Sequence, residues 1–199
     1  MSNQIRRVEL ADAAVVHAIY GPFVSDSAIS FETVAPDVIE IRRRIEAQCN
    51  RYPWLVFEAD GNVVGYAYAS AHRSRQAYRW SVDVCIYVAP GLHRRGIGHA
   101  LYASLLDLLR RQGFVNAYAG ITLPNPSSVR LHESLGFEPI GIYRRVGFKF
   151  DRWHDVLWLH LPLSEDSTPP NEPLATDYLW NDAAVTEILR RRAQVVSVE

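Results

Sequence analysis

The sequence predicts a mixed α/β domain, with one strand and the helix after it at its centre. Four β-branched residues alternate along the expected strand 81–88, which suits a pleated buried surface: Val82, Val84, Ile86 and Val88. After a turn at Pro90 and Gly91, apolar residues take the spacing of one helical face: Ala100, Leu101, Leu105, Leu108 and Leu109. Segments of strand and helix type recur along the rest of the chain, so the fold class is α/β (α+β).

The segments before the central strand are bounded by turn residues. Gly21 and Pro22 are expected to end the first helix, and Pro36 with Asp37 to start the second. Asp60-Gly61-Asn62 between two apolar runs is a hairpin signal. In chain order we expect a strand at 5–10, a helix at 11–20, a loop at 25–35, a helix from 36 onward, and strands at 54–59 and 63–70.

The segments after the central strand carry clear helix boundaries. The long helix begins at Gly98 and ends at Gly113, a residue type that commonly caps helix C-termini. Asn125 is the expected N-cap of the next helix, with Pro126 in its first turn and Gly136 at its end. Three further strands are expected at 117–123, 139–150 and 153–163, the last two as a hairpin.

Composition and charge fit a soluble globular protein. Of 199 residues, 48% are hydrophobic and 22% charged, which is enough apolar material for a core. A net charge of −1 predicts neither a nucleic acid partner nor an anionic membrane. No apolar run approaches the ~20 residues of a membrane span, and the first residues lack a signal-peptide core. With only two cysteines, we expect a cytoplasmic protein without disulfides.

The composition changes after residue 163, which divides the chain into a domain at 1–163 and a tail at 164–199. Residues 164–173 contain three prolines and three acidic residues and predict a linker. Residues 182–193 predict a short helix with apolar residues on one side. That helix packs on the domain, packs on a partner subunit, or is loose; the sequence leaves the three open.

The turn around Gly96 and Gly98 predicts a phosphate site. Glycine lets a ligand approach the backbone closely, and the first N–H groups of a helix have no internal partner. Arg94 and Arg95 add positive charge beside the helix dipole. The alternative is an ordinary helix start with two solvated arginines. The turn matches neither a P-loop nor the dinucleotide fingerprint, because Leu101 stands where a third glycine or alanine belongs.

Several motifs resemble those of the GCN5-related N-acetyltransferases (GNAT). Arg95-x-x-Gly98-x-Ala100 after strand 81–88 resembles their acetyl-CoA signature, and the segments 125–128 and 131–137 follow in the same order. The resemblance spans about residues 4–163 and implies a mixed sheet of about seven strands, splayed at the middle, with about four helices. It is sharpest to the phosphinothricin and methionine sulfoximine acetyltransferase branch, through residues 51–56, 73–80, 128–133, 147–149 and 153–156.

The resemblance implies acetyl-CoA as the cosubstrate and no metal. The diphosphate would lie on the turn made by Arg94, Arg95, Gly96, Ile97, Gly98 and His99. The pantetheine arm would pair with the strand backbone at Ile86, Tyr87 and Val88 like a missing strand. Asn125 resembles the family position that contacts the pantetheine.

Asp83 and His132 are the candidate catalytic residues. A base speeds attack by an amine that is protonated at neutral pH, and Asp83 is a carboxylate in an apolar strand. Resembling enzymes carry Glu there; the shorter Asp favours a bridging water or a modest role, and the alternative is a hydrogen-bonded strand-end residue. His132 is also histidine in this branch and could act as acid or base, or be a core histidine bonded to a backbone carbonyl.

Arg73, Arg75, Tyr78 and Phe31 are the candidate substrate-binding residues. Arg73 and Arg75 lie two residues apart and share a face if extended, as capture of a carboxylate or phosphinate requires. The alternative is a solvated basic loop. The resemblance implies a hydrogen bond from Tyr78 and a substrate pocket lined by Phe31, which otherwise packs on the core.

Together these observations predict an N-acetyltransferase that transfers acetyl from acetyl-CoA to the α-amino group of a small amino acid. The named candidates are phosphinothricin, methionine sulfoximine and methionine sulfone. The resemblance also implies a homodimer. Alternatives are a GNAT enzyme for another small amine, a non-catalytic acyl-CoA-binding module, and a nucleotide-binding module that uses the glycine turn.

Overall fold

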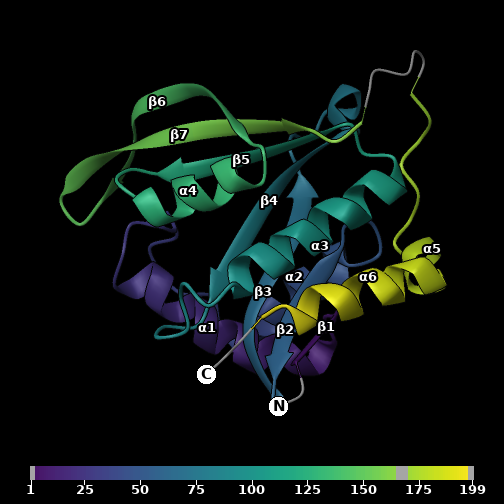
Figure 1. The fold of residues 1–199 in the computed structure, drawn as a ribbon. Helices are drawn as coiled ribbons and strands as arrows, with labels where there is room; N and C mark the ends of the chain where they lie inside the picture. The colour runs from purple at the N-terminus through teal and green to yellow at the C-terminus, as the bar shows by residue number, and fades with distance from the viewer. Residues whose placement is uncertain (1–2, 165–169, 197–199) are drawn as a thin grey trace.

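Seven strands form one mixed sheet at the centre of the protein (Figure 1). The computed structural model describes residues 3–164 and 170–196. The strands pair in the order β1-β2-β3-β4-β5-β7-β6, and all neighbours are antiparallel except β4 and β5. Their bounds are β1 Asn3–Arg7, β2 Trp54–Ala59, β3 Asn62–Ala71, β4 Ser81–Val88, β5 Asn116–Thr122, β6 Glu138–Lys149 and β7 Arg152–Pro162.

Helices cover the two faces of this sheet and produce two cores. Helices α1 and α2 pack over one face around Val16, Ile45 and Trp54. Helices α3 and α4 lie over the other face, where Leu101 and Leu105 are fully buried. The helices are α1 Ala13–Ser25, α2 Val38–Gln48, α3 Ile97–Gln112, α4 Pro126–Ser134, α5 Asp177–Trp180 and α6 Ala183–Gln194, with 3₁₀ turns at Leu10–Asp12 and Gln76–Tyr78.

The predicted sheet and both hairpins are confirmed. Asp60 and Gly61 join β2 to β3 with φ of 48° and 80°, the positive values of a type I′ turn. Phe150 and Asp151 join β6 to β7 in the same way, with φ of 50° and 55°. The predicted helix caps are confirmed as well: the Asn125 side chain accepts a hydrogen bond from the Ser128 N–H at 3.2 Å.

Two boundary predictions near the N-terminus are wrong. Helix α1 does not end at Gly21 and Pro22 but continues to Ser25, because burial of Val24 in the last turn offsets the hydrogen bond that proline cannot donate. The first strand ends at Arg7 rather than at residue 10. The Asp12 carboxylate accepts from the Glu9 N–H at 2.7 Å and draws the chain into a 3₁₀ turn.

The described residues form six α-helices where about four were expected, because residues 177–194 form two more. The predicted helix at 182–193 is confirmed as α6, with the Asp182 side chain as its N-cap. It packs against α3 and β1 and buries Val185, Leu189 and Ala193 in the larger core. Among its polar contacts, Arg192 pairs with Asp107 at 3.0 Å. Helix α6 is therefore docked on the domain (Figure 1).

None of the helices within the described ranges is long and apolar enough to cross a membrane.

Candidate active site

The sheet opens into a wedge between β4 and β5. These strands pair only from Ser81 with Asn116 to Asp83 with Tyr118, and beyond that point they diverge. A cavity of about 730 Å³ lies along the open part of β4. Its walls include Leu131 from the α4 side and Phe23 from the α1 side, so the cavity is lined from both faces of the sheet.

Eight of the ten predicted cofactor residues line this cavity: Ile86, Tyr87, Val88, Arg94, Gly96, Gly98, His99 and Asn125. Ile97 does not, because its side chain is 1% exposed and belongs to the core. Arg95 is half-buried and also does not line the cavity. The turn and the strand, which are separated in sequence, therefore meet at one cavity.

The glycine turn has the backbone of an anion cradle. Gly96 is the N-cap of α3 with φ of 84°, and Arg94 has φ of 64°, so both are left-handed. A Cβ on Gly98 would lie 3.4 Å from Leu131 and 3.6 Å from Ile86, so a larger side chain would narrow the cavity between β4 and α4. These residues fit a diphosphate at the helix N-terminus with an extended arm along β4.

His132 is buried in the α4 side of the wedge. Its Nδ1 donates to the Ser128 carbonyl oxygen at 2.7 Å, and its Nε2 accepts from the Tyr102 hydroxyl at 3.1 Å. Burial lowers the pKa of His132 below its ordinary 6.5. Both ring nitrogens are thus engaged in a neutral ring, which favours a structural role; its catalytic role stays a prediction.

Asp83 lies at the closed end of the wedge and is bonded to a histidine that the sequence analysis did not select. His72 Nδ1 and Asp83 Oδ1 are 2.6 Å apart, and their side chains are 13% and 27% exposed. Burial raises the pKa of the Asp83 carboxyl, and the bond to His72 opposes that shift. The pair joins the end of β3 to the start of β4.

Aromatic rings hold His72 in place. Its ring stacks on Tyr118 with centroids 4.4 Å apart, and the edges of Tyr78 and Trp158 approach it at 5.9 Å and 6.1 Å. His160 stacks on Tyr118 as well, at 4.9 Å, and its Nε2 bonds to Asn116. Side chains alternate along β5, so this aromatic group lies on the face opposite α3 and the buried Ala117.

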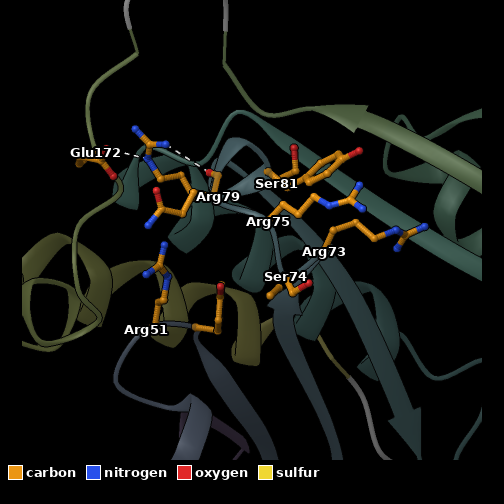
Figure 2. A pocket seen from close by; sticks show the side chains of 11 residues that line it. Arg51, Arg73, Ser74, Arg75, Arg79, Ser81 and Glu172 are labelled. Atoms are coloured by element: carbon orange, nitrogen blue, oxygen red, sulfur yellow. Dashed lines mark hydrogen bonds and ion pairs between the residues drawn. The ribbon is translucent and has the colours of Figure 1, made fainter.

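The loop after His72 carries the predicted arginines. Figure 2 shows the Arg73 and Arg75 side chains extending to the same side, whereas Arg51 and Arg79 lie toward Glu172. Arg73 lies over the Trp158 ring at 5.7 Å, and Arg79 pairs with Glu172 at 2.7 Å.

A second cavity, of about 500 Å³, lies beside this loop. Arg73, Arg75 and Tyr78 all line it. The structure therefore brings these three predicted substrate residues together, and Tyr78 also contacts the His72 ring.

Phe31 lies apart from these arginines, against the β6–β7 hairpin. Its ring is 6.1 Å from His154 and packs directly over Gly147, where a Cβ would clash with it. The loop that carries Phe31 is held by buried Lys149, whose Nζ donates to the carbonyls of Val24, Ser30 and Glu32 at 2.6, 2.8 and 2.7 Å. All three ammonium hydrogens are thereby used.

Sequence reasoning missed His72 and Lys149. A signal for His72 existed, because the two expected strands around it pair antiparallel and place Ser70 opposite Asp83. His72 lies two residues after Ser70, so its imidazole comes beside the Asp83 carboxylate. Lys149 had no such signal, because its partners are backbone oxygens 117 to 125 residues away.

Comparison with known proteins identifies the family. Residues 5–158 match the model of the acetyltransferase (GNAT) domain. The phosphinothricin N-acetyltransferase of Streptomyces viridochromogenes is 41% identical over 153 residues, 77% of this chain and 84% of that protein. The L-methionine sulfoximine/L-methionine sulfone acetyltransferase of Salmonella typhimurium is 37% identical over 166 residues, 83% and 97% of the two chains.

Comparison with a solved structure supports the same family. The phosphinothricin acetyltransferase of Sinorhizobium meliloti in complex with acetyl-CoA superposes with a TM-score of 0.81 at 36% identity, covering 87% of this chain and 94% of that one. A sheet splayed after a short parallel pairing, with a glycine turn at its mouth, defines an acyltransferase of the acetyl-CoA-dependent type. The chain belongs to the GNAT acetyltransferases, as the sequence motifs predicted.

The described residues contain no cluster of three or more His, Cys, Asp or Glu side chains that could hold a metal. That no metal takes part in the reaction stays a prediction.

Proposed function

We propose that this protein transfers acetyl from acetyl-CoA to the α-amino group of a small acidic or methionine-like amino acid analogue. Phosphinothricin, methionine sulfoximine and methionine sulfone are the candidate acceptors. The observation that carries the proposal is the wedge itself, with a helix-start anion cradle at its mouth and two arginines beyond its closed end. The acceptors named for relatives at 37% and 41% identity support this acceptor class.

The cavity residues divide into a diphosphate group and an arm group. The backbone amides at Gly96 and Gly98, with Arg94 beside them, suit the diphosphate. The β4 backbone at Ile86, Tyr87 and Val88 has no β5 partner and can pair with an extended arm, while Asn125 reaches it from α4. Acetyl-CoA then supplies a thioester whose acetyl end lies toward Asp83.

Arg73, Arg75 and Tyr78 suit the acidic end of the acceptor. Guanidinium groups bind carboxylate and phosphinate oxygens with paired hydrogen bonds, and the side chain of Arg75, which lines the second cavity, has no hydrogen bond or ion pair within the described part of the chain. Phe31, held over Gly147 and partly exposed, is the proposed apolar contact for the side chain of the acceptor. A polycationic acceptor would be repelled by the same arginines.

Thiol release tests the proposal. Purified protein with acetyl-CoA should release coenzyme A thiol with methionine sulfone, methionine sulfoximine or phosphinothricin, and much less with a polyamine. If thiol were released with the polyamine and with none of the three amino acids, the proposed acceptor class would be wrong and a polyamine would take its place. Coenzyme A that binds, with no thiol released for any amine, would support a non-catalytic acyl-CoA-binding module.

A homodimer in the cytoplasm is part of the proposal. The β6–β7 hairpin exposes a patch of large apolar side chains, and such patches mark interaction surfaces: Ile140, Ile142, Tyr143, Val146, Phe148 and Trp153. The two cysteines are free, which suits a reducing compartment. Sedimentation of wild type and Phe148→Glu checks the dimer, since a charge in the patch should yield monomers.

A further inference from the structure

We propose that His72 is the general base that takes the proton from the acceptor amine, and that Asp83 acts by orienting His72. The inference rests on the proposed acetyl transfer and assigns a residue within it. It differs from the sequence prediction, in which Asp83 or His132 carried the proton. The argument depends on the ring nitrogens of His72, on its position in the sheet, and on the alternatives around it.

The hydrogen bond to Asp83 fixes the state of the His72 ring. An ionised carboxylate can only accept, so the 2.6 Å contact with Asp83 Oδ1 places the hydrogen on Nδ1. The lone pair is then on Nε2. Within residues 3–164 and 170–196 this Nε2 has no hydrogen-bond partner, so it is available to an acceptor amine.

His72 lies where the wedge closes. The last residue pair between β4 and β5 is Asp83 with Tyr118, and His72 bonds to the first and stacks on the second at 4.4 Å. An arm that replaces β5 along β4 must stop at this pair. The acetyl end of such an arm would therefore stop beside the His72–Asp83 pair, next to Arg73, which donates to the His72 carbonyl.

Neither of the two predicted bases matches this position as well. Asp83 already uses Oδ1 to hold His72, and a shorter carboxylate reaches less far toward the acceptor. His132 is buried on the other face with both nitrogens bonded within the protein. Histidine is also the side chain that most often acts as a general base.

The proposed step balances as follows. His72 Nε2 accepts one proton from the ammonium group of the acceptor, and the freed nitrogen lone pair attacks the thioester carbonyl carbon. A C–N bond forms, the C–S bond breaks, and the electron pair of that bond leaves on sulfur. The attacking nitrogen loses its second proton to the departing sulfur, which leaves as a thiol. The first proton, held on His72, then passes to solvent, so one proton is released per acetyl group transferred.

The groups around His72 define the charge that it meets. Arg73 lies next in sequence, donates to the His72 carbonyl at 2.7 Å and stabilises the Asp83 carboxylate. Tyr78 and Tyr118 present rings, and Trp158 presents an edge. Asp83 is thus the only carboxylate among the contacts of His72 in the described ranges.

A matched pair of variants tests the assignment. His72→Asn keeps an N–H donor near the Nδ1 position, so it retains the bond to Asp83 but has no base. His160→Gln keeps a donor near Nε2 for Asn116 and removes the other histidine that stacks on Tyr118. We expect His72→Asn to lower kcat by about 10²–10⁴-fold, while His160→Gln stays within about threefold of wild type.

Three further measurements separate chemistry from structure. The acid limb of the kcat/KM–pH profile should be lost in His72→Asn and kept in His160→Gln, and calorimetry should give the same coenzyme A affinity for all three proteins. Added imidazole should restore part of the activity of His72→Ala in proportion to its concentration. His72→Asn that keeps more than a third of kcat with its acid limb intact would overturn the assignment and leave the acetyltransferase proposal standing. Wild type that releases no thiol with any amine would overturn both.

Discussion

His132 and His72 lie on opposite faces of the same wedge, and their surroundings differ in kind. His132 is 3% exposed, and both of its ring nitrogens are bonded to neighbours within the protein. His72 has one nitrogen on a carboxylate and the other without a partner among the described residues. A histidine whose hydrogen bonds are complete stabilises the fold, whereas one held from a single side can exchange a proton with a ligand.

The same contrast extends from the two histidines to their surroundings. The core under α3 is apolar, and helix α6 adds Val185 and Leu189 to it. On the opposite face, the strand ends around His72 carry loops, arginines and aromatic rings beyond the core that α1 and α2 cover. We therefore expect substitutions in the α3 core to change the free energy of unfolding, and substitutions at the strand ends around His72 to change catalysis.

Asp83→Asn is expected to give the largest effect of all. An amide can present N–H to His72 Nδ1 and so reverse the ring tautomer, which moves the lone pair away from Nε2. We expect kcat to fall by about 10²–10⁴-fold with little change in urea unfolding. Thiol release measures kcat, and circular dichroism measures urea unfolding. A variant that loses stability in proportion to activity would break the contrast between the faces.

Leu189→Ala tests the α3 face. Leu189 is 7% exposed and packs in the core that α6 shares with α3. Its truncation should lower the free energy of unfolding by about 2–5 kcal/mol while kcat stays near wild type. Val195→Ala, at a side chain that is 81% exposed, is the control and should be neutral. Equal effects of the two variants on urea unfolding would show that the tail is not part of the core.

Gly147→Ala tests the wall formed by Phe31. A Cβ at this position would clash with the Phe31 ring, so the ring must move. We expect a loss of about 1–3 kcal/mol in stability and a higher KM for the amino acid, with the KM for acetyl-CoA unchanged. Phe31→Ala in the same chain should remove most of the stability loss, and a double-mutant cycle measures that coupling. Strict additivity would contradict the contact.

His132→Phe should give the smallest effect, seen as a change in the pH dependence of stability. Burial holds the pKa of His132 below its ordinary 6.5, so the unfolded chain binds the proton more readily. The contribution of neutral His132 to the free energy of unfolding is therefore complete above about pH 6.5, and it decreases as the pH falls toward the lower pKa of the folded state. Urea unfolding between about pH 5 and 8 should show that the free energy of unfolding falls less steeply with decreasing pH in the variant than in wild type. Burial also lowers the pKa of His160, and the contribution of His160 to the pH dependence of stability is the same in wild type and variant.

Local signals made much of this molecule predictable. The start of α3 after the glycine turn, the caps at Asn125 and Gly113 and the two hairpins each depend on neighbouring residues, and these structural predictions are confirmed. The phosphate site at the glycine turn stays a prediction. The end of α1 was wrongly predicted at Pro22, because the packing of Val24 decides where the helix ends and packing is not a local property. The His72–Asp83 pair was missed for a related reason: its partners become neighbours only once β3 and β4 are in register.

The two ends of the described chain are adjacent. The Asn3 side chain donates to the Val196 carbonyl at 2.6 Å, and Val196 lies 3.8 Å from where a Cβ on Gly96 would be. Chains whose ends meet tolerate circular permutation, so a short linker could join them and new ends could be opened at the Phe150–Asp151 turn. A fluorophore attached at the exposed Val195, next to Val196, would lie near the Gly96 turn and report binding of coenzyme A at the proposed diphosphate site.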